Sequence, residues 1–170
     1  MKVVGISGWS GNGKTTLLVK LIPELTKLGY RVSSLKHAHH NFDVDKPGKD
    51  SYRHREAGAE EVMVASAARW ALMHENRTEQ EPDLNELISH MTPVDILLVE
   101  GFKREAFPKI EVWRSDENGP PLHLTDKSII AVATNNPDVT TKLPILNLDN
   151  PSDIAVFIEE RFLKPGASHG

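Results

Sequence analysis

Cysteine is absent from this chain of 170 residues, and aromatic residues make up only 6% of it. Without cysteine the protein forms neither disulfides nor thiolate metal sites, a usage that fits a cytoplasmic protein. No apolar run approaches about 18 residues, so we expect no membrane span. The formal net charge is −4, which lacks the basic excess typical of nucleic-acid binding. A β-type run begins almost at residue 1, so we expect no signal peptide.

A glycine-rich segment near the start carries the clearest signal. It reads Gly8-Trp9-Ser10-Gly11-Asn12-Gly13-Lys14-Thr15, and it matches the Walker A pattern G-x-x-x-x-G-K-[ST] of phosphate-binding loops. A β-type run precedes it at 2–7 and a helical run follows at 16–22, which is the context the motif requires. Backbone N–H groups of such a loop surround phosphate oxygens, and the positive end of the helix favours the same charge.

Each residue of this loop has an expected role. Lys14 is expected to reach the β- and γ-phosphates of a nucleotide, and the hydroxyl of Thr15 to ligate Mg²⁺. The predicted phosphate-binding residues are Ser10, Gly11, Asn12, Gly13, Lys14, Thr15 and Thr16.

The alternation of strands and helices predicts an α/β protein with a P-loop NTPase fold. We expect a mostly parallel central sheet flanked by helices, since a strand–helix–strand unit over 2–36 is a βαβ crossover. Further strands are predicted at 95–99, 109–113, 128–134 and 143–148, and a terminal helix at 151–163. Residues 61–66 and 69–74 predict an extra antiparallel hairpin. Gly29 is predicted to end the first helix, and Asp83 with Glu86 is predicted to cap a later one. One domain is expected over 1–164, with a frayed tail over 165–170.

A second signal is the apolar run 95–99, which ends in Glu100-Gly101. It is typical of a Walker B strand, whose terminal carboxylate orients Mg²⁺ or the attacking water. We predict this role for Glu100, and a backbone N–H contact to the γ-phosphate for Gly101. The alternative is a buried strand followed by a surface acid. Asp45 and Asp50, in the polar segment after the second strand, are predicted to complete the Mg²⁺ site, the alternative being a solvated loop.

Two other segments have a functional and an ordinary interpretation. Asn135-Asn136-Pro137-Asp138 follows a predicted strand and resembles the Asn-Lys-x-Asp motif of guanine-specific proteins, with Asn136 in place of Lys. Asn135 and Asp138 would then bind the base, although the segment also fits an ordinary turn. His37, His39 and His40 have a spacing that can bind Zn²⁺ or Ni²⁺, but also fit a polar hydrogen-bonding loop.

Four segments together resemble the molybdopterin-guanine dinucleotide biosynthesis protein B (MobB) family. They are 9–18 in the glycine loop, the His-rich run 36–40, the run 43–51 (Asp-Val-Asp-Lys-Pro-Gly-Lys-Asp-Ser) and Val99-Glu100-Gly101-Phe102-Lys103. The resemblance extends from the first strand to about Lys103, with 110–134 agreeing in pattern.

This resemblance implies a homodimeric P-loop protein that binds GTP with Mg²⁺ and hydrolyses GTP weakly, through Lys14 and Glu100. It implies an adaptor or GTP supplier for the molybdenum cofactor guanylyltransferase, the enzyme that joins GMP to molybdopterin. Molybdopterin is a further candidate ligand, for the His-rich loop with Lys46, Lys49 and Lys103. An arginine for the γ-phosphate is not assigned; Arg53, Arg55 and Arg104 are candidates.

Two alternatives stay open from the residues alone. One is a metal-chaperone GTPase of the nickel-insertion type, using the three histidines. The other is a small-molecule kinase, against which the short, acid-rich segment 76–82 argues because it makes a poor lid. We also predict that the strands at 62–66, 69–74 and 109–113 help form a homodimer, the alternative being a sheet extension within a monomer.

Overall fold

The computed structural model describes residues 1–38, 42–77, 81–115 and 119–164. By its internal contacts the chain divides into two compact units, with bounds Met1–His37 plus Met91–Gly170 for the first and Ala38–His90 for the second. The prediction of one domain over 1–164 concerns independent folding, which this division does not test. The predicted tail, 165–170, lies outside the described residues. None of the described helices is long and apolar enough to cross a membrane.

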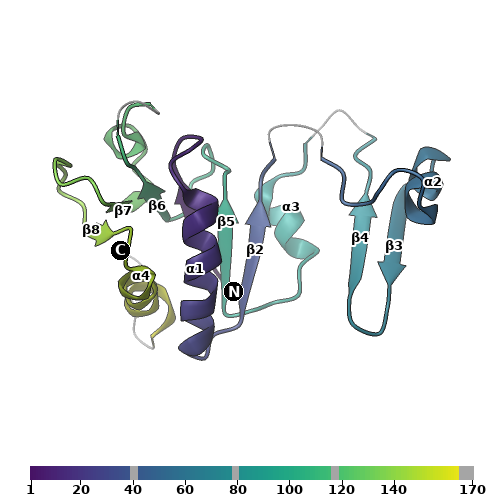
Figure 1. Cartoon of the computed structure of the whole chain (residues 1–170), viewed down its shortest axis with the longest axis horizontal. Helices are drawn as coiled ribbons and strands as arrows, with labels where there is room; N and C mark the ends of the chain where they lie inside the picture. The colour runs from purple at the N-terminus through teal and green to yellow at the C-terminus, as the bar shows by residue number, and fades with distance from the viewer. Residues whose placement is uncertain (39–41, 78–80, 116–118, 165–170) are drawn as a thin grey trace. The chain divides into compact units, whose positions relative to one another are not determined.

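The first unit is built on a six-stranded sheet (Figure 1). Its strands are β1 (Lys2–Ser7), β2 (Val32–Lys36), β5 (Ile96–Glu100), β6 (Lys109–Val112), β7 (Ile129–Thr134) and β8 (Ile145–Asn147). They lie in the order β2-β5-β1-β6-β7-β8, and every neighbouring pair is parallel. The predicted α/β class with a parallel central sheet is therefore confirmed.

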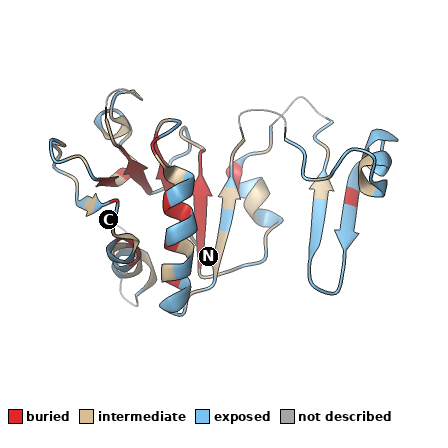
Figure 2. Cartoon of the chain, viewed as in Figure 1, coloured by how far each residue is buried: buried red, intermediate tan, exposed pale blue. Residues whose placement is uncertain are grey.

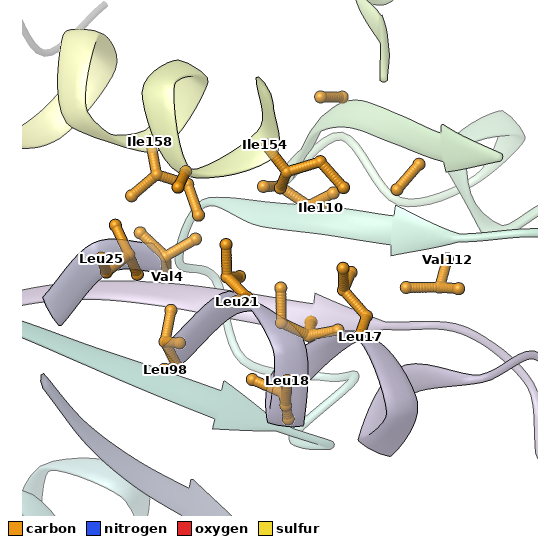
Figure 3. Close-up of a cluster of buried hydrophobic side chains, with 14 of the residues drawn as sticks. Val4, Leu17, Leu18, Leu21, Leu25, Leu98, Ile110, Val112, Ile154 and Ile158 are labelled. Carbon is orange, nitrogen blue, oxygen red and sulfur yellow. The ribbon is translucent and has the colours of Figure 1, made fainter. Parts of the chain in front are cut away.

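Helices α1 (Lys14–Lys27) and α4 (Pro151–Ile158) cover one face of this sheet, and the π-helix η3 (Glu159–Leu163) continues α4. Figure 3 shows leucines of α1 pointing toward Val4 and Leu98 of the strands, with Ile154 and Ile158 of α4 completing the cluster. Each fully buried leucine stabilises the fold by about 1.5–3 kcal/mol. The same packing holds the first turn of α1, which carries Lys14 and Thr15, against the sheet.

Helix α1 ends where the sequence predicted. Gly29 adopts a left-handed φ of 94°, and its N–H donates to Thr26 O at 2.9 Å. The next N–H, of Tyr30, donates to Leu25 O at 3.2 Å. A glycine is favoured there because a Cβ is strained at positive φ. Chain reversal at this point lets β2 run parallel to β1.

Strand β6 is an interior strand and corrects one prediction. It lies between β1 and β7, with Gly5 opposite Lys109 and Ile110 opposite Ala131, and all four of its residues are buried (Figure 2). The prediction that 109–113 helps form a homodimer by pairing or stacking is therefore wrong, because both edges of the strand are already paired within the chain and its side chains are buried.

The buried charges of β6, on Lys109 and Glu111, both have partners inside the protein. The Lys109 ammonium, 1% exposed, donates to Lys103 O at 2.9 Å, Asp126 Oδ2 at 3.0 Å and Ser128 Oγ at 2.9 Å. This contact ties the loop that follows β5 to the loop that precedes β7.

Glu111 plays a similar part on the same face of β6. Its carboxylate accepts the N–H groups of Leu122 and His123, at 2.6 and 3.0 Å, and pairs with His123 Nδ1 at 2.6 Å. These bonds hold the 3₁₀ helix η2 (Leu122–Leu124).

The second unit contains α2 (Asp50–Glu56), β3 (Glu61–Ala65), β4 (Trp70–His74) and α3 (Leu84–Ser89). The predicted hairpin is confirmed: β3 and β4 pair antiparallel, and the Ser66 N–H donates to Arg69 O across the turn at 2.9 Å. The predicted cap of α3 is also present, since Asp83 accepts the Glu86 N–H at 2.9 Å. Arg55 binds the carboxylates of Asp43 and Asp45 at 2.8 and 3.1 Å.

Candidate functional site

The glycine loop lies between the end of β1 and the start of α1, at the carboxyl edge of the sheet. Gly8, Gly11 and Gly13 all have positive φ, at 142°, 82° and 95°. A Cβ on Gly8 would lie 2.4 Å from the carbonyl oxygen of Val112 in β6. Glycine is thus needed at Gly8 both for its backbone angle and for the close approach of β6.

A cavity of about 370 Å³ opens above this loop. Its lining residues are Ser10, Gly11, Gly13, Lys14, Thr15, Thr16, Lys36 and Glu100. The structure therefore brings together the predicted phosphate-loop residues and the predicted Walker B carboxylate. Asn12 does not line the cavity, since it is fully buried.

Glu100 reaches the cavity because β5 pairs with β1, with Ile6 opposite Glu100. The Thr15 hydroxyl lies 3.1 and 3.2 Å from the two carboxylate oxygens of Glu100. Lys36, at the end of β2 on the other side of β5, places its Nζ 3.6 Å from Glu100 Oε1. A hydroxyl and a carboxylate facing each other form an oxygen donor set that suits Mg²⁺.

Lys14 is held over the loop, where its Nζ donates to Trp9 O at 3.0 Å. Burial lowers the pKa of Lys14 below its ordinary value of 10.5; the charge of Glu100 opposes this shift, while Lys103 and Lys36 add to it. The ammonium is therefore less favourable here than in water. A bound phosphate would offset that cost, because it would supply negative charge and acceptors.

Arg114 braces the loop from the end of β6, and nothing in the motif pattern predicted it. Its Nε donates to Asn12 O at 3.0 Å, and its own carbonyl accepts from Asn136 Nδ2 at 2.9 Å. The sequence reasoning also missed Lys36. Both residues stand at or just beyond the carboxyl ends of strands, where ligands gather in parallel sheets, and that position was the available signal.

Gly101 follows β5 with a φ of 101°, and a Cβ there would lie 2.7 Å from His37 Cβ. The His37 N–H donates to Glu100 O at 2.8 Å, and its ring centroid lies 4.6 Å from that of Phe102. The backbone around Glu100 is thus closely packed. A contact from the Gly101 N–H to phosphate stays a prediction.

The predicted base-binding residues follow β7 and do not line the cavity. Asn135 Nδ2 donates to Asp149 Oδ2 at 3.2 Å. The N–H of Asp138 donates to Asn136 Oδ1 at 2.9 Å, which is the geometry of an Asx turn. The carboxylate of Asp138 is on an exposed residue. The guanine assignment of Asn135 and Asp138 stays a prediction.

The predicted acidic metal ligands belong to the second unit. Asp45 is bound by Arg55, and Asp50 is exposed in the first turn of α2. Neither lines the cavity, and their Mg²⁺ role stays a prediction. Among the described residues no group of three His, Cys, Asp or Glu could hold a metal ion, and His39 and His40 lie outside those residues.

A parallel sheet, a glycine loop that leads into a helix, and a facing strand that ends in a carboxylate define a P-loop nucleotide-binding protein. Comparison with known proteins narrows this class. The family profile described as "Molybdopterin guanine dinucleotide synthesis protein B" (MobB) matches residues 3–135. The chain belongs to the MobB family.

Individual relatives agree with this assignment. The chain is 45% identical over 161 residues to the molybdopterin-guanine dinucleotide biosynthesis adapter protein of Escherichia coli strain K12, covering 93% of this chain and 91% of that protein. It is 46% identical over 157 residues to the adapter protein of the same name in Haemophilus influenzae, covering 92% and 87%. The crystal structure of Bacillus subtilis MobB superposes with a TM-score of 0.75 at 26% identity, covering 94% of this chain and 97% of that one.

Proposed function

We propose that the protein binds GTP with Mg²⁺ and serves as an adapter in the synthesis of molybdopterin guanine dinucleotide. The observation that carries this proposal is the cavity over the glycine loop, into which Lys14, Thr15 and Glu100 converge. Backbone N–H groups and Lys14 would bind the phosphates. The names of the E. coli and H. influenzae relatives supply the pathway.

Mg²⁺ would bind between Thr15 and Glu100. Their oxygens already lie within 3.1–3.2 Å of each other, so one ion could replace that hydrogen bond with two oxygen ligands or bound waters. The ion would offset phosphate charge. The chain's own part is to keep the Glu100 carboxylate at the cavity, through strand pairing and the His37 N–H bond to its carbonyl.

Hydrolysis by this site would be slow. Fast phosphoryl transfer uses a cation placed on the transferred phosphate, in many NTPases an arginine. No arginine is among the described residues that line the cavity. A weak GTPase suits an adapter that holds the nucleotide for a partner, and the partner we propose is the molybdenum cofactor guanylyltransferase.

The proposed GTP site is tested by calorimetric titration of GTP and of ATP, each with Mg²⁺. Lys14→Ala should strongly lower the affinity for both GTP and ATP, because both nucleotides make the same phosphate contact. Asp138→Ala should lower the affinity for GTP and leave that for ATP unchanged. Glu160→Ala removes the same charge at another exposed residue and is the control, which should change neither affinity. Unchanged GTP affinity in Lys14→Ala would refute the phosphate site. Equal GTP and ATP affinity in every variant would refute the guanine assignment and favour the kinase alternative.

The protein is further proposed to be a homodimer that uses the β3–β4 hairpin. Both strands expose apolar side chains, among them Met63, Val64, Trp70 and Leu72. Large exposed apolar side chains grouped on one element are typical of interaction surfaces. Sedimentation should give the mass of two chains at micromolar concentration, and Trp70→Ser should shift the protein toward one chain. A wild-type mass of one chain would contradict this proposal.

A further inference from the structure

Lys36 contributes a second ammonium to the phosphate-loop cavity. It is the last residue of β2 and lines the cavity together with Lys14 and Glu100. Its Nζ lies 3.6 Å from Glu100 Oε1, yet its side chain is 61% exposed, against 11% for Glu100. The contact is therefore longer than a close ion pair, and the lysine side chain has room to move.

The backbone of Lys36, by contrast, is firmly placed. It pairs with Glu100 in the β2–β5 register, and the next N–H, of His37, donates to Glu100 O at 2.8 Å. Gly101 packs so closely against His37 that a Cβ would lie 2.7 Å from His37 Cβ. A lysine on a fixed strand end, with a flexible four-carbon stem, can deliver its charge to several points in the same cavity.

The charges around the cavity favour a polyanion. Lys14 and Lys36 face one carboxylate, Glu100, and both Lys36 and Lys103 are near enough to lower the pKa of Lys14. An Mg²⁺ ion on Thr15 and Glu100 would take over the neutralisation of that carboxylate. The Lys36 ammonium would then be surplus positive charge at the cavity wall, and the most negative part of a nucleoside triphosphate is its terminal phosphate.

We propose that Lys36 binds the terminal phosphate, so that the site distinguishes nucleoside triphosphate from diphosphate. This inference rests on the proposed nucleotide site and adds a residue that no motif assigned. Lys14 is expected to reach the β-phosphate, which both nucleotides have, as well as the γ-phosphate, whereas Lys36 acts on the γ-phosphate alone. Lys36 thereby contributes to the choice between nucleotides when they bind, and it does not replace the arginine that many fast NTPases place on the transferred phosphate.

The experiment compares guanosine 5′-(β,γ-imido)triphosphate with GDP, each in calorimetric titration with Mg²⁺. A charge-assisted hydrogen bond of the usual strength corresponds to a loss of about tenfold or more. We expect Lys36→Ala to lower the affinity for the triphosphate analogue by at least that factor, and the affinity for GDP by less than about threefold. Lys36→Arg should retain most of the discrimination. The exposed Lys20→Ala, on α1, removes the same charge outside the cavity and should change neither affinity.

Two results would overturn the proposal. One is a Lys36→Ala protein whose affinities for the triphosphate analogue and for GDP fall by the same factor, or do not fall at all. The other is a Lys36→Ala protein that needs more Mg²⁺ to bind GDP, because Lys36 would then serve only to orient Glu100. Failure of the nucleotide site itself would look different from failure of the Lys36 proposal. In that case the wild-type protein would bind neither ligand, or Lys14→Ala would bind both with wild-type affinity.

Discussion

Replacing the buried Lys109 by methionine tests whether its hydrogen bonds hold together the loop after β5 and the loop before β7. The substitution keeps an unbranched side chain, one atom shorter, and removes an ammonium that is 1% exposed. It leaves three acceptors without their donor: Lys103 O, Asp126 Oδ2 and Ser128 Oγ, at 2.9, 3.0 and 2.9 Å. Two loops beside the glycine loop lose their common anchor.

The expected destabilisation is about 3 kcal/mol. Hydrogen bonds to a charged group each stabilise by about 1.5–3 kcal/mol, but burying the ammonium itself costs several kcal/mol. Removing one partner of a buried pair typically costs about 3–5 kcal/mol. The lower end applies here because the Asp126 side chain is 26% exposed and water can replace part of the lost contact. In a chain of this size the melting temperature should fall by about 6–12 °C.

Urea unfolding followed by circular dichroism measures this loss, with the exposed neighbour Lys127→Met as control. The control should stay within about 0.5 kcal/mol of wild type. Combining Lys109→Met with Asp126→Asn should cost less than the sum of the two, because neutralising Asp126 removes the unpaired carboxylate. A loss below about 1 kcal/mol in Lys109→Met, or strict additivity, would refute the view that this buried contact anchors the loops.

The same contact predicts a pH dependence. Burial raises the pKa of Asp126, but hydrogen bonds from Ser128 and Lys109 outweigh burial and hold the pKa below its ordinary value of 3.8. A carboxyl with a lowered pKa stabilises the fold above pH 3.8 and loses that contribution as the pH falls through its folded value. The stability difference between wild type and Lys109→Met should therefore shrink below about pH 3.8. A difference that stays constant at lower pH would contradict the assignment.

Three further predictions concern Gly8 and Lys14 of the glycine loop and the buried Glu111 of β6. Gly8→Ala should destabilise the protein by about 3 kcal/mol, because the new Cβ combines a positive φ with a 2.4 Å approach to Val112 O; an unchanged melting temperature would contradict this. Glu111→Gln should cost about 2–3 kcal/mol in urea unfolding, since the amide cannot accept with both ends from the two N–H groups and His123; a loss under 0.5 kcal/mol would count against it. Nucleotide affinity should fall as the pH rises through the lowered pKa of Lys14, which lies below 10.5, because phosphate binds the charged amine. Titration across alkaline pH tests this, and an affinity that is flat there would oppose a role for Lys14.

Local signals in the chain predicted much of the fold. The strand, loop and helix over the first 27 residues, the stop at Gly29, the hairpin and the cap at Asp83 each depend on neighbouring residues alone. Glycine at positive φ and an acid that caps a helix act over a few positions, so a pattern in the sequence reveals them. The helix predicted over 151–163 was correct in place, although its last turn is the π-helix η3.

The interior position of β6 could not be predicted in this way. Lys109 and Glu111 alternate with apolar residues, as on a half-exposed strand, and only their distant partners Asp126 and His123 make burial possible. Buried charge is tolerated where it is paired and hydrogen-bonded, a condition that depends on contacts far apart in the chain. The predicted dimer role for this strand failed for that reason.

By itself the sequence determined that this protein has a phosphate loop and a strand ending in Glu100, because these motifs are contiguous and their backbone requirements are local. Only the tertiary structure decided which other charges share the cavity. Lys36 lies 64 positions from Glu100 in the chain, and meets it only because β2 pairs in parallel with β5. Arg114 reaches Asn12 because β6 lies beside β1. Parallel pairing brings the carboxyl ends of distant strands to one edge, and the order of the strands sets which side chains meet there.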